Sequence, residues 1–485
     1  MRILLIQPDF QSSLAGFRRA AMPEPLGLEM LAAVAGEHEV RILDMRLDGD
    51  LDAAFNEFSP DLVGVTALTP EVYAAHDVLR HVRQLSSETF TFVGGHHATL
   101  LPQDFHQPFV DAIVPGEGEI IFPRLLAELA KGPDLSGVPG LIRRGSDGTF
   151  ITNPGGPDDL DMDALPLPRR DLTAPYRDEY FFLFDKPDSS VATGRGCPYR
   201  CNFCSVWKFY EGRTRQMSAD RVVREVAGIE TDHITFVDDN FLMNYRRENE
   251  IADRIKAEGI RKRYSMECRT DSIVRHPELV EKWVDIGLYA VLLGLEGSDR
   301  TLKSVNKKNS ADVNNEAIRI LQDLGVIIWG AFIADPGWDV ADFQDLREYV
   351  SRHHITHTQF TVLTPLPGSE LWRDRYDELI THDYTCYDCL HSVLPTKLPR
   401  DEFYQQFAKL YHQNDLTPYY ELVSDGKLTI DDCRRGKAML DEMSEWTNYI
   451  PGDPVLSQLS ADEFPSQRKG HFTSDTGSAI GEANQ

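Results

Sequence analysis

The first 130 residues alternate short apolar runs with longer segments of helical periodicity. Apolar runs that predict strands lie at 3–6, 39–43, 61–66, 91–93 and 111–114. Segments with the spacing of helices lie at 25–34, 51–58, 71–85 and about 119–129. Continuous apolar runs are typical of parallel strands that are buried on both faces. The pattern predicts a doubly wound α/β domain over residues 1–135, with its ligand outside the carboxyl ends of the strands.

The alternation stops after residue 130 and resumes near residue 186. Residues 136–185 are rich in Pro, Gly and Asp and predict a short β element within a linker. After the strand that precedes Cys197, further strands are predicted at 233–237, 264–268, 290–294, 326–333 and 357–363. Helices are predicted between them, at 219–229, 247–258, 277–286, 313–324 and 341–353. Six such units predict a partial (β/α)6 barrel over residues 186–395, with its chemistry at the strand carboxyl ends.

The remaining residues lose the strand signal. Helical patterns at 400–411, 417–423 and 430–446 predict a small helical domain over residues 396–450. Residues 451–485 are rich in Gly, Ser and Asp and predict a disordered tail.

Composition narrows the class of protein. The chain has 485 residues, of which 41% are hydrophobic and 26% charged, and no apolar stretch is long enough to predict a transmembrane helix. Its formal charge of −27 argues against broad nucleic-acid binding. The apolar run at the N-terminus is too short for a signal peptide. Seven cysteines are an odd and modest number for this length and argue against a disulfide scaffold.

Three of those cysteines, Cys197, Cys201 and Cys204, stand at a C-x₃-C-x₂-C spacing. A [4Fe–4S] cluster is usually held by Cys thiolates, and three cysteines on one loop leave the fourth iron open for another ligand. Gly196 and Pro198 suit such a loop, because one lets the backbone approach the cluster and the other stiffens it. A zinc site is the alternative, but it usually needs four ligands and no fourth lies nearby. The spacing predicts a cluster, and the reduced thiols indicate the cytoplasm.

The motif resembles the signature of the radical S-adenosylmethionine (AdoMet) superfamily. The resemblance implies that the amino and carboxylate groups of AdoMet bind the open iron. Reductive cleavage of AdoMet then gives a 5′-deoxyadenosyl radical, and an electron donor such as flavodoxin or ferredoxin is expected.

Charged residues at the predicted strand ends are candidates for AdoMet binding. The resemblance assigns Glu296 to the ribose hydroxyls and Asp238, with Asp239 beside it, to the methionine amino end. Arg269 could pair with the AdoMet carboxylate, since a guanidinium matches that group. Each of these residues could instead cap a following helix.

Small and hydroxyl residues end three strands of the first predicted domain. Such residues let a large flat ligand lie against the edge of the sheet. By composition alone, they are equally typical of a nucleotide pocket or of ordinary tight turns. The order of the loops, G-G-x-H-A-T followed by P-G-E-G-E, resembles the cobalamin-binding domain that precedes many radical AdoMet domains. The resemblance implies cobalamin contacts from Thr66, Gly94, Gly95, His97, Thr99, Gly116 and Glu117. Hydrogen bonds within the loop are an equally good explanation of His97.

The sequence differs from one group of cobalamin-binding domains in the residue that would bind the lower face of the cobalt. Cobalamin domains of the methionine synthase type carry D-x-H-x-x-G after the first strand, whereas residues 7–11 here contain no His. A similar-looking segment, Asp104 to His106, follows the fourth strand and lacks the Gly, so we discount it. The resemblance therefore implies cobalt without a His ligand beneath it.

The resemblance to cobalamin-binding radical AdoMet enzymes covers residues 1–395. The segments Pro23–Ala33 and His391–Pro399 look most like the hopanoid C-3 and bacteriochlorophyll side-chain methylases. This implies transfer of a methyl group to an unactivated carbon of a small or polycyclic, lipid-like natural product, with two AdoMet molecules consumed. A cyclase or rearrangement enzyme without methyl transfer, and a non-catalytic cobalamin sensor, are the alternatives. No catalytic side chain is assigned, and Cys386 and Cys389 are interpreted as spare thiols rather than a second metal site.

Overall fold

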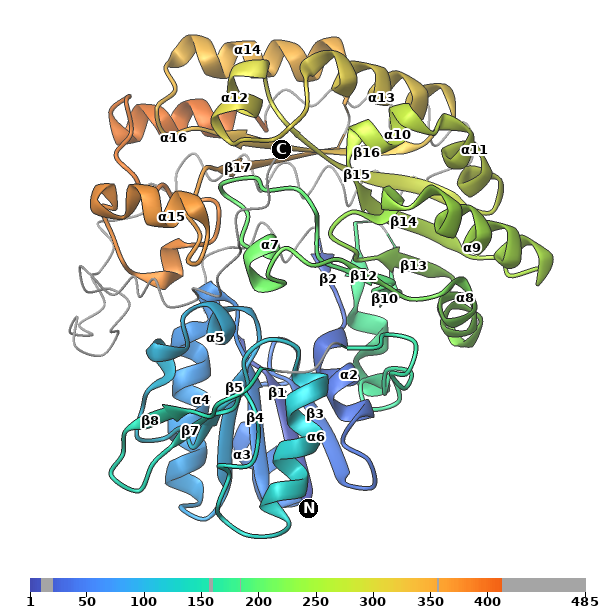
Figure 1. Ribbon diagram of the computed structural model, residues 1–485. Helices are drawn as coiled ribbons and strands as arrows, with labels where there is room; N and C mark the ends of the chain where they lie inside the picture. Colours follow the sequence, from blue (N-terminus) through green and yellow to red (C-terminus); the bar gives the residue numbers. More distant parts are fainter. Residues whose placement is uncertain (10–20, 157–159, 184, 356, 412–485) are drawn as a thin grey trace, which may run out of the picture.

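The computed structural model describes residues 1–9, 21–156, 160–183, 185–355 and 357–411 (Figure 1). Two α/β units follow one another along the chain, one built on a seven-stranded sheet and one on a six-stranded sheet. Figure 1 shows the first unit below the second, with the short helix α7 (Val206–Phe209) between them.

The first sheet has the order β3-β1-β4-β5-β6-β7-β8. Its parallel strands are β1 (Arg2–Gln7), β3 (Glu39–Asp44), β4 (Leu62–Thr66), β5 (Phe90–Gly94) and β6 (Ala112–Ile113). The four apolar residues of β1, Ile3 to Ile6, are at most 1% exposed, as burial on both faces requires. An antiparallel hairpin, β7 (Ile142–Arg144) and β8 (Phe150–Thr152), extends the sheet beyond β6. The sheet therefore continues past residue 135, into the segment that the sequence assigns to the linker.

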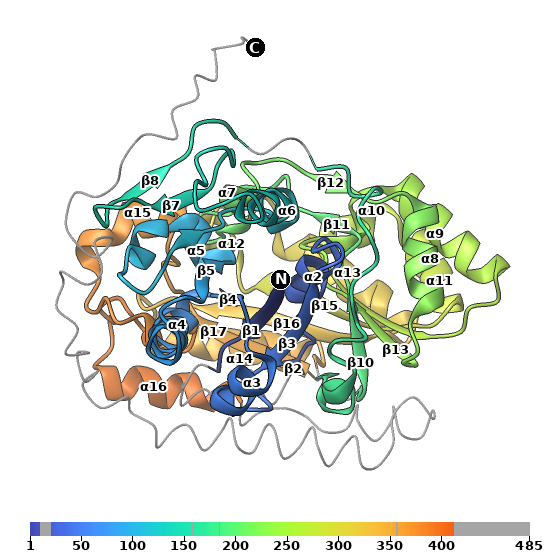
Figure 2. The same cartoon turned by 90° about the horizontal axis from the view of Figure 1, so that it is seen from below.

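Helices cover both faces of this sheet. Figure 2 shows α2 (Leu26–Ala33) and α6 (Gly118–Leu129) on one side and α3 (Leu51–Phe58) and α4 (Val72–Leu85) on the other. Two separate hydrophobic clusters correspond to these two layers. The predicted doubly wound domain is confirmed.

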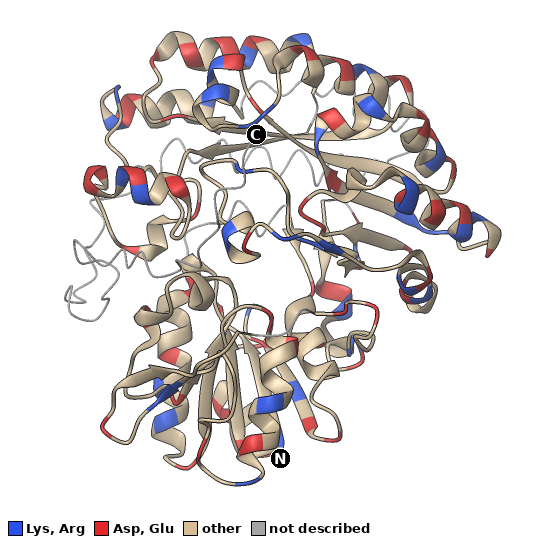
Figure 3. Ribbon diagram, viewed as in Figure 1, with Lys and Arg blue, Asp and Glu red and all other residues tan. Residues whose placement is uncertain are grey.

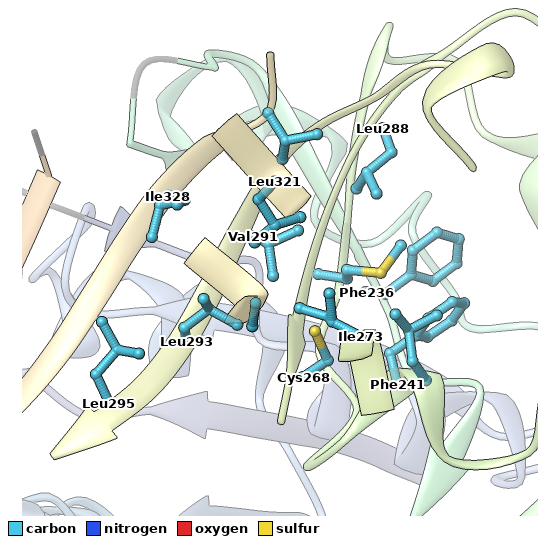
Figure 4. Packing of buried hydrophobic residues seen from close by; sticks show 14 of the residues in the cluster. Phe236, Phe241, Cys268, Ile273, Leu288, Val291, Leu293, Leu295, Leu321 and Ile328 are labelled. Carbon is cyan, nitrogen blue, oxygen red and sulfur yellow. The ribbon is translucent and has the colours of Figure 1, made fainter. Parts of the chain in front are cut away.

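The second sheet is parallel throughout and keeps the order of the sequence. Its strands are β10 (Asp188–Val191), β13 (His233–Phe236), β14 (Arg263–Cys268), β15 (Leu288–Glu296), β16 (Ile327–Ala334) and β17 (His357–Val362). The outer layer is α8 (Ala219–Gly228), α9 (Tyr245–Ala257), α11 (Pro277–Asp285), α13 (Ala311–Asp323) and α14 (Val340–Arg352). One large cluster fills the space between the layers; Figure 4 shows part of it, including Phe236, Val291 and Leu321. The six-unit partial barrel is confirmed.

Short elements between the predicted ones carry much of the local geometry. The cysteine loop lies within an antiparallel ribbon of β11 (Gly194–Arg195) and β12 (Arg215–Gln216). A second ribbon pairs β2 (Ala21–Met22) with β9 (Phe181–Phe182). Short helices are α5 (His96–Leu100), α10 (Thr270–Arg275), α12 (Asp299–Ser304) and α15 (Glu370–Arg375). Their length gives almost no periodicity, so the sequence does not predict them.

After β17 the chain returns to the first domain. Trp372, Tyr376 and Tyr384 belong to the same hydrophobic cluster as the buried residues of α4. The Tyr384 hydroxyl also donates to Asp104 Oδ2 over 2.6 Å. This segment therefore ties the barrel to the first domain at α4 and Asp104.

The C-terminal part is described only to residue 411. Helix α16 (Arg400–Lys409) packs against α14 and matches the first predicted helix of this region. The helices predicted at 417–423 and 430–446, and the tail from 451, lie outside the described residues. Within the described part of the chain, no helix has both the length and the apolar character needed to cross a membrane.

Candidate active site between the two domains

The cysteine loop is fixed at the mouth of the barrel by segments from elsewhere in the chain. The backbone N–H of Asn202 donates to Val305 O over 3.2 Å, and its side-chain amide donates to Ser304 O over 2.9 Å. On its other side, Leu371 N donates to Asn202 O over 2.8 Å. The turn after α12 and the start of α15 therefore hold the loop from two directions.

Two aspartates at the end of β13 hold the start of the same loop. Asp238 accepts from the backbone N–H groups of Thr193 and Gly194, at 2.5 and 3.0 Å, and from the Thr193 hydroxyl. Asp239 Oδ2 accepts from the Gly196 N–H over 3.0 Å. Burial raises the pKa of Asp238 to about 6 despite these bonds. In the structure both carboxylates anchor the ribbon, a role that the sequence does not predict, and neither caps a helix.

The three thiols are partly exposed and lie together on the loop. Burial raises the pKa of each, that of Cys204 to about 12, while the charges of Lys307 and Arg269 act to lower the pKa of Cys201. Thiols in such a place lose their protons to a metal rather than to water. Among the described residues, no three His, Cys, Asp or Glu side chains converge on a point suitable for one metal ion, as zinc would require. Thiolates that each bind a different iron of a cube need no such point.

Arg269 braces the cysteine loop. Its guanidinium lies over the Tyr199 ring at 3.6 Å from the centroid, and Tyr199 stands between Cys197 and Cys201. Nε donates to Asp271 Oδ1 over 2.8 Å and Nη2 donates to Lys308 O over 3.0 Å. Nη1 has no partner among the described residues, so one edge of the guanidinium remains available to a ligand.

Glu296 ends β15 beside the same loop. Its Oε1 accepts from Lys307 Nζ over 2.5 Å, and both side chains are more than nine-tenths buried. The residue adopts a φ of +59° where the register with β16 shifts. This turn of the backbone directs the side chain toward Lys307, and Oε2 has no hydrogen bond among the described residues. Lys307 is a site residue that no sequence motif indicates.

A cavity of about 390 Å³ lies between the two domains. The first domain contributes the ends of β4 and β5, the start of α6 and part of α2, including the predicted residues Thr66, Gly94, Gly95, Gly116 and Glu117. The barrel contributes Arg195, Phe209, Tyr210 and Val237 among others. The cavity is therefore a shared feature of both domains.

Glycines give this cavity its shape. A Cβ on Gly95, which has a φ of +90°, would lie 2.5 Å from Thr66 Oγ1. A Cβ on Gly118 would lie 2.9 Å from the Leu31 side chain. These two glycines therefore allow the loops to pack closely on the domain itself. At Gly27 and Gly116, which also line the cavity, a Cβ would meet nothing within 4 Å, so the backbone there is open to a bulky ligand such as a corrin or its nucleotide tail.

His97 and Thr99 lie behind the cavity wall. His97 is fully buried, and its ring nitrogens bond Thr69 Oγ1 at 3.1 Å and Asp104 Oδ2 at 3.0 Å. The Thr99 hydroxyl donates to Gly95 O and accepts from Gly116 N–H, both over 2.8 Å. The structure thus places His97 as a residue that is fixed by hydrogen bonds within the first domain. Thr99 joins the loop that contains Gly95 to the loop that contains Gly116.

Both glycine loops of the first domain also hold the cysteine loop. Arg195 donates to Glu117 over 2.7 Å and to Glu119 over 2.5 Å, and Arg215 pairs with the second oxygen of Glu117 at 2.5 Å. On the far side of the cysteines, His96 bonds Ser205 Oγ over 3.1 Å and stacks on Phe209 at 5.3 Å. Glu117 thus has both carboxylate oxygens paired with barrel arginines. These partners are about 76 to 109 positions apart, so no local pattern predicts them.

Cys386 and Cys389 lie in the segment after β17, outside the cysteine loop. Cys386 is buried in the cluster that joins α4 to the segment after β17, and the Cys389 thiol bonds Thr364. Among the described residues, no three His, Cys, Asp or Glu side chains form a group there that could hold a metal ion.

Comparison with known proteins matches both halves of the site. The model of the radical SAM superfamily matches residues 191–350, and that of the B12 binding domain matches residues 16–126. The hopanoid C-3 methylase of Methylococcus capsulatus is 35% identical over 80% of this chain and 75% of its own length. The chain belongs to the cobalamin-binding radical SAM family. Its cofactors are therefore a [4Fe–4S] cluster, AdoMet and cobalamin.

Other relatives and solved structures agree with the fold. The bacteriochlorophyllide d C-12(1)-methyltransferase of Chlorobaculum tepidum is 25% identical over 84% of this chain and 86% of its own length. The cobalamin-dependent radical enzyme OxsB superimposes with a TM-score of 0.71 at 15% identity, over 92% of this chain and 71% of that one. The methyltransferase TsrM of Kitasatospora setae gives 0.63 at 19% identity, over 78% and 74%.

Proposed function

We propose that this chain is a methyltransferase that places a methyl group on an unactivated carbon of a small or polycyclic natural product. The observation that supports this most directly is the shared cavity, because glycine loops of the cobalamin domain and residues beside the cysteine loop line one space. A reaction that needs both cofactors requires them to lie close together, as a cavity shared by the two domains allows. The relative at 35% identity is a C-3 methylase of hopanoids, which are polycyclic lipids.

The chain's residues would divide the work as follows. Cys197, Cys201 and Cys204 hold the cluster, while Asp238 and Asp239 hold the loop that carries them. The free edge of Arg269 is suited to the AdoMet carboxylate, and Oε2 of Glu296 is suited to a ribose hydroxyl. Thr66, Gly94, Gly95 and Gly116 form the wall against which cobalamin lies. When bound, the cofactors supply the radical chemistry and the methyl group.

Cyclisation without methyl transfer is the second candidate. The anaerobic magnesium-protoporphyrin IX monomethyl ester cyclase of Rubrivivax gelatinosus is 26% identical over 85% of this chain and 77% of its own length. The two reactions differ in what they make from AdoMet. A methyl transfer of this type releases S-adenosylhomocysteine alongside 5′-deoxyadenosine, whereas cyclisation releases no S-adenosylhomocysteine.

The test is anaerobic turnover of the reconstituted enzyme with polycyclic lipids and tetrapyrroles, followed by mass spectrometry. We expect both AdoMet products and a gain of one CH₂ in the substrate. Deoxyadenosine without S-adenosylhomocysteine would refute methyl transfer. Cys201→Ala should abolish the cluster absorbance and all deoxyadenosine formation; retention of either would refute the ligand assignment. We place the enzyme in the cytoplasm, where its thiols stay reduced and an electron donor is available.

A further inference from the structure

We propose that Arg200, Lys208 and Lys303 form a docking surface for an acidic one-electron donor protein. The inference rests on the proposed function, because it requires a cluster on the neighbouring cysteines. These three residues are called the cationic rim below.

The rim is built from two segments that hold each other. Arg200 and Lys208 both lie over the ring of Trp207, at 5.6 and 4.1 Å from its centroid. Lys303 is on α12, whose next residue, Ser304, accepts from the Asn202 side chain over 2.9 Å. Asn306 in turn donates to the Arg200 carbonyl over 2.9 Å. The three cations therefore lie on the loop that carries Cys201 and Cys204 or on the segment bonded to it.

The charges of the rim are not neutralised within the described part of the chain. Arg200 and Lys303 are exposed and Lys208 is half-buried. None of the three forms an ion pair with a described residue, whereas exposed cations elsewhere commonly do; Arg319, for example, pairs with both Glu316 and Asp323. Residues 195–216 hold five Arg or Lys, of which Arg195 and Arg215 pair with acids of the first domain and Arg213 pairs with Glu211. Arg200 and Lys208 are the two cations of this segment that form no ion pair with a described residue. Figure 3 shows blue segments on α7 and the neighbouring loops at the centre of the molecule.

This local excess contrasts with a net charge of −27 for the whole chain. An acidic partner is repelled by most of such a surface, so a cationic patch determines where it can approach. Complementary charge mainly raises the rate of encounter and fixes orientation, which suits a brief electron-transfer contact. A partner on the rim stands beside thiols that are themselves partly exposed. In the step one electron leaves the donor and enters the cluster, so the donor is oxidised and the cluster reduced by one electron each.

The experiment measures cluster reduction in the holoenzyme by stopped-flow absorbance, with two reductants. Reduced flavodoxin is the acidic protein donor, and titanium(III) citrate is the small reductant that needs no docking surface. The triple variant Arg200→Gln/Lys208→Gln/Lys303→Gln should lower the second-order rate with flavodoxin about tenfold at low ionic strength. Its rate should also depend less on salt than the wild-type rate does. The rate with titanium(III) citrate should stay unchanged.

Two further variants serve as a control for net charge and as a second test of the cationic rim. Arg261 is another exposed cation without an ion pair among the described residues, and it precedes β14 at the opposite end of the barrel strands. Arg261→Gln should leave both rates unchanged. Lys303→Glu lies outside the cysteine loop, so it tests the rim if the triple variant disturbs the cluster; it should slow reduction by flavodoxin alone.

Equal rates for the wild type and Lys303→Glu with flavodoxin at low salt would overturn the docking surface. An equal fall for Arg261→Gln would also overturn it, since the effect would then follow net charge rather than position. A wild-type chain that holds no reducible cluster would instead refute the proposed function.

Discussion

The two domains differ in the residues that they offer to their cofactors. In the first domain, the ends of β4 and β5 and the start of α6 carry glycines, Thr66 and apolar side chains, and the two acids there, Glu117 and Glu119, are paired with barrel arginines. On the side of the barrel, the strand ends carry thiols and charged groups that are paired with one another, such as Glu296 with Lys307 and Arg269 with Asp271. Under the proposed function, the first domain recognises cobalamin by shape, and the barrel recognises the cluster and AdoMet by metal ligation and charge.

This difference follows from what each cofactor offers. Cobalamin presents a broad surface, so glycine loops that let the backbone approach closely are effective. The cluster needs thiolates, and AdoMet carries a carboxylate, an ammonium and a sulfonium. Buried charges are tolerable only when paired, which explains why the barrel's charged residues hold each other as well as the cysteine loop.

The two domains are joined directly by the ion pairs of Arg195 and Arg215 with Glu117 and Glu119, which are called the Arg195 seam below. Glu119 is buried, and Arg195 lowers its pKa although burial alone would raise it. Glu119→Ala should lower the free energy of unfolding by about 3 kcal/mol, because it removes one partner of a buried pair. Thermal unfolding followed by calorimetry should show the change, and deoxyadenosine formation should survive better than methyl transfer.

The matched control is Glu230, which pairs with Arg177 in an exposed ion pair between the linker and the barrel. Glu230→Ala should change stability by less than about 1 kcal/mol. Equal losses in the two variants would show that the seam contributes no more than an ordinary surface pair. Equal losses of cleavage and methyl transfer in Glu119→Ala would show that the seam does not position one cofactor against the other.

Whether the first domain recognises cobalamin by the shape of its cavity can be tested at Gly27. This glycine lies in α2 and lines the cavity, and a Cβ there would meet nothing within 4 Å. Gly27→Leu should fill part of the cavity and weaken cobalamin binding about 10- to 100-fold, by analogy with the cost of overpacking. Cobalamin titration followed by absorbance gives the affinity.

Gly27→Ala is the control for helix propensity. Both variants should stabilise the empty protein by up to about 1 kcal/mol, since glycine is unfavourable inside a helix. Only leucine has the bulk to displace the ligand. If both variants bind cobalamin as the wild type does, this part of the cavity does not belong to the cobalamin site.

The sequence predicts the two α/β domains because long amphipathic helices and buried strands have strong local patterns. It also places Cys197, Cys201 and Cys204, and the cavity residues Thr66, Gly94 and Gly95, because a motif at a strand end identifies each set. Lys307 and Arg195 have no such pattern. Their function depends on a partner that only the folded chain brings near.

The assignments of Asp238 and Glu117 illustrate a further limit. Both residues follow strands, where a ligand is expected, and in the structure both carboxylates bond groups of the protein itself. Position along a strand indicates which residues reach the site. It does not indicate whether they bind the ligand or hold the loops that do.

The cost of burying a charge in the barrel can be tested at one buried acid, Glu248 of α9. Its Oε1 accepts from Arg247 over 2.9 Å, while Oε2 has no partner among the described residues. Arg247 itself donates to the carbonyls of Thr193 and Met217, which flank the cysteine ribbon. Burial raises the pKa of Glu248 to about 7. The charged form is therefore the one that the fold disfavours.

The sign of the pH dependence follows from that raised pKa. The contribution of Glu248 to stability is fully present below its unfolded pKa of 4.5 and is lost as the pH rises through about 7. Glu248→Gln carries no charge at any pH, so its advantage over the wild type should grow by about 2 kcal/mol between pH 5 and pH 8. Urea unfolding at the two pH values measures this. Glu316→Gln, at an exposed residue whose pKa Arg319 lowers, should show no such gain. A constant difference between Glu248→Gln and the wild type would mean that Arg247 stabilises the carboxylate fully, and that the barrel holds this charge without cost.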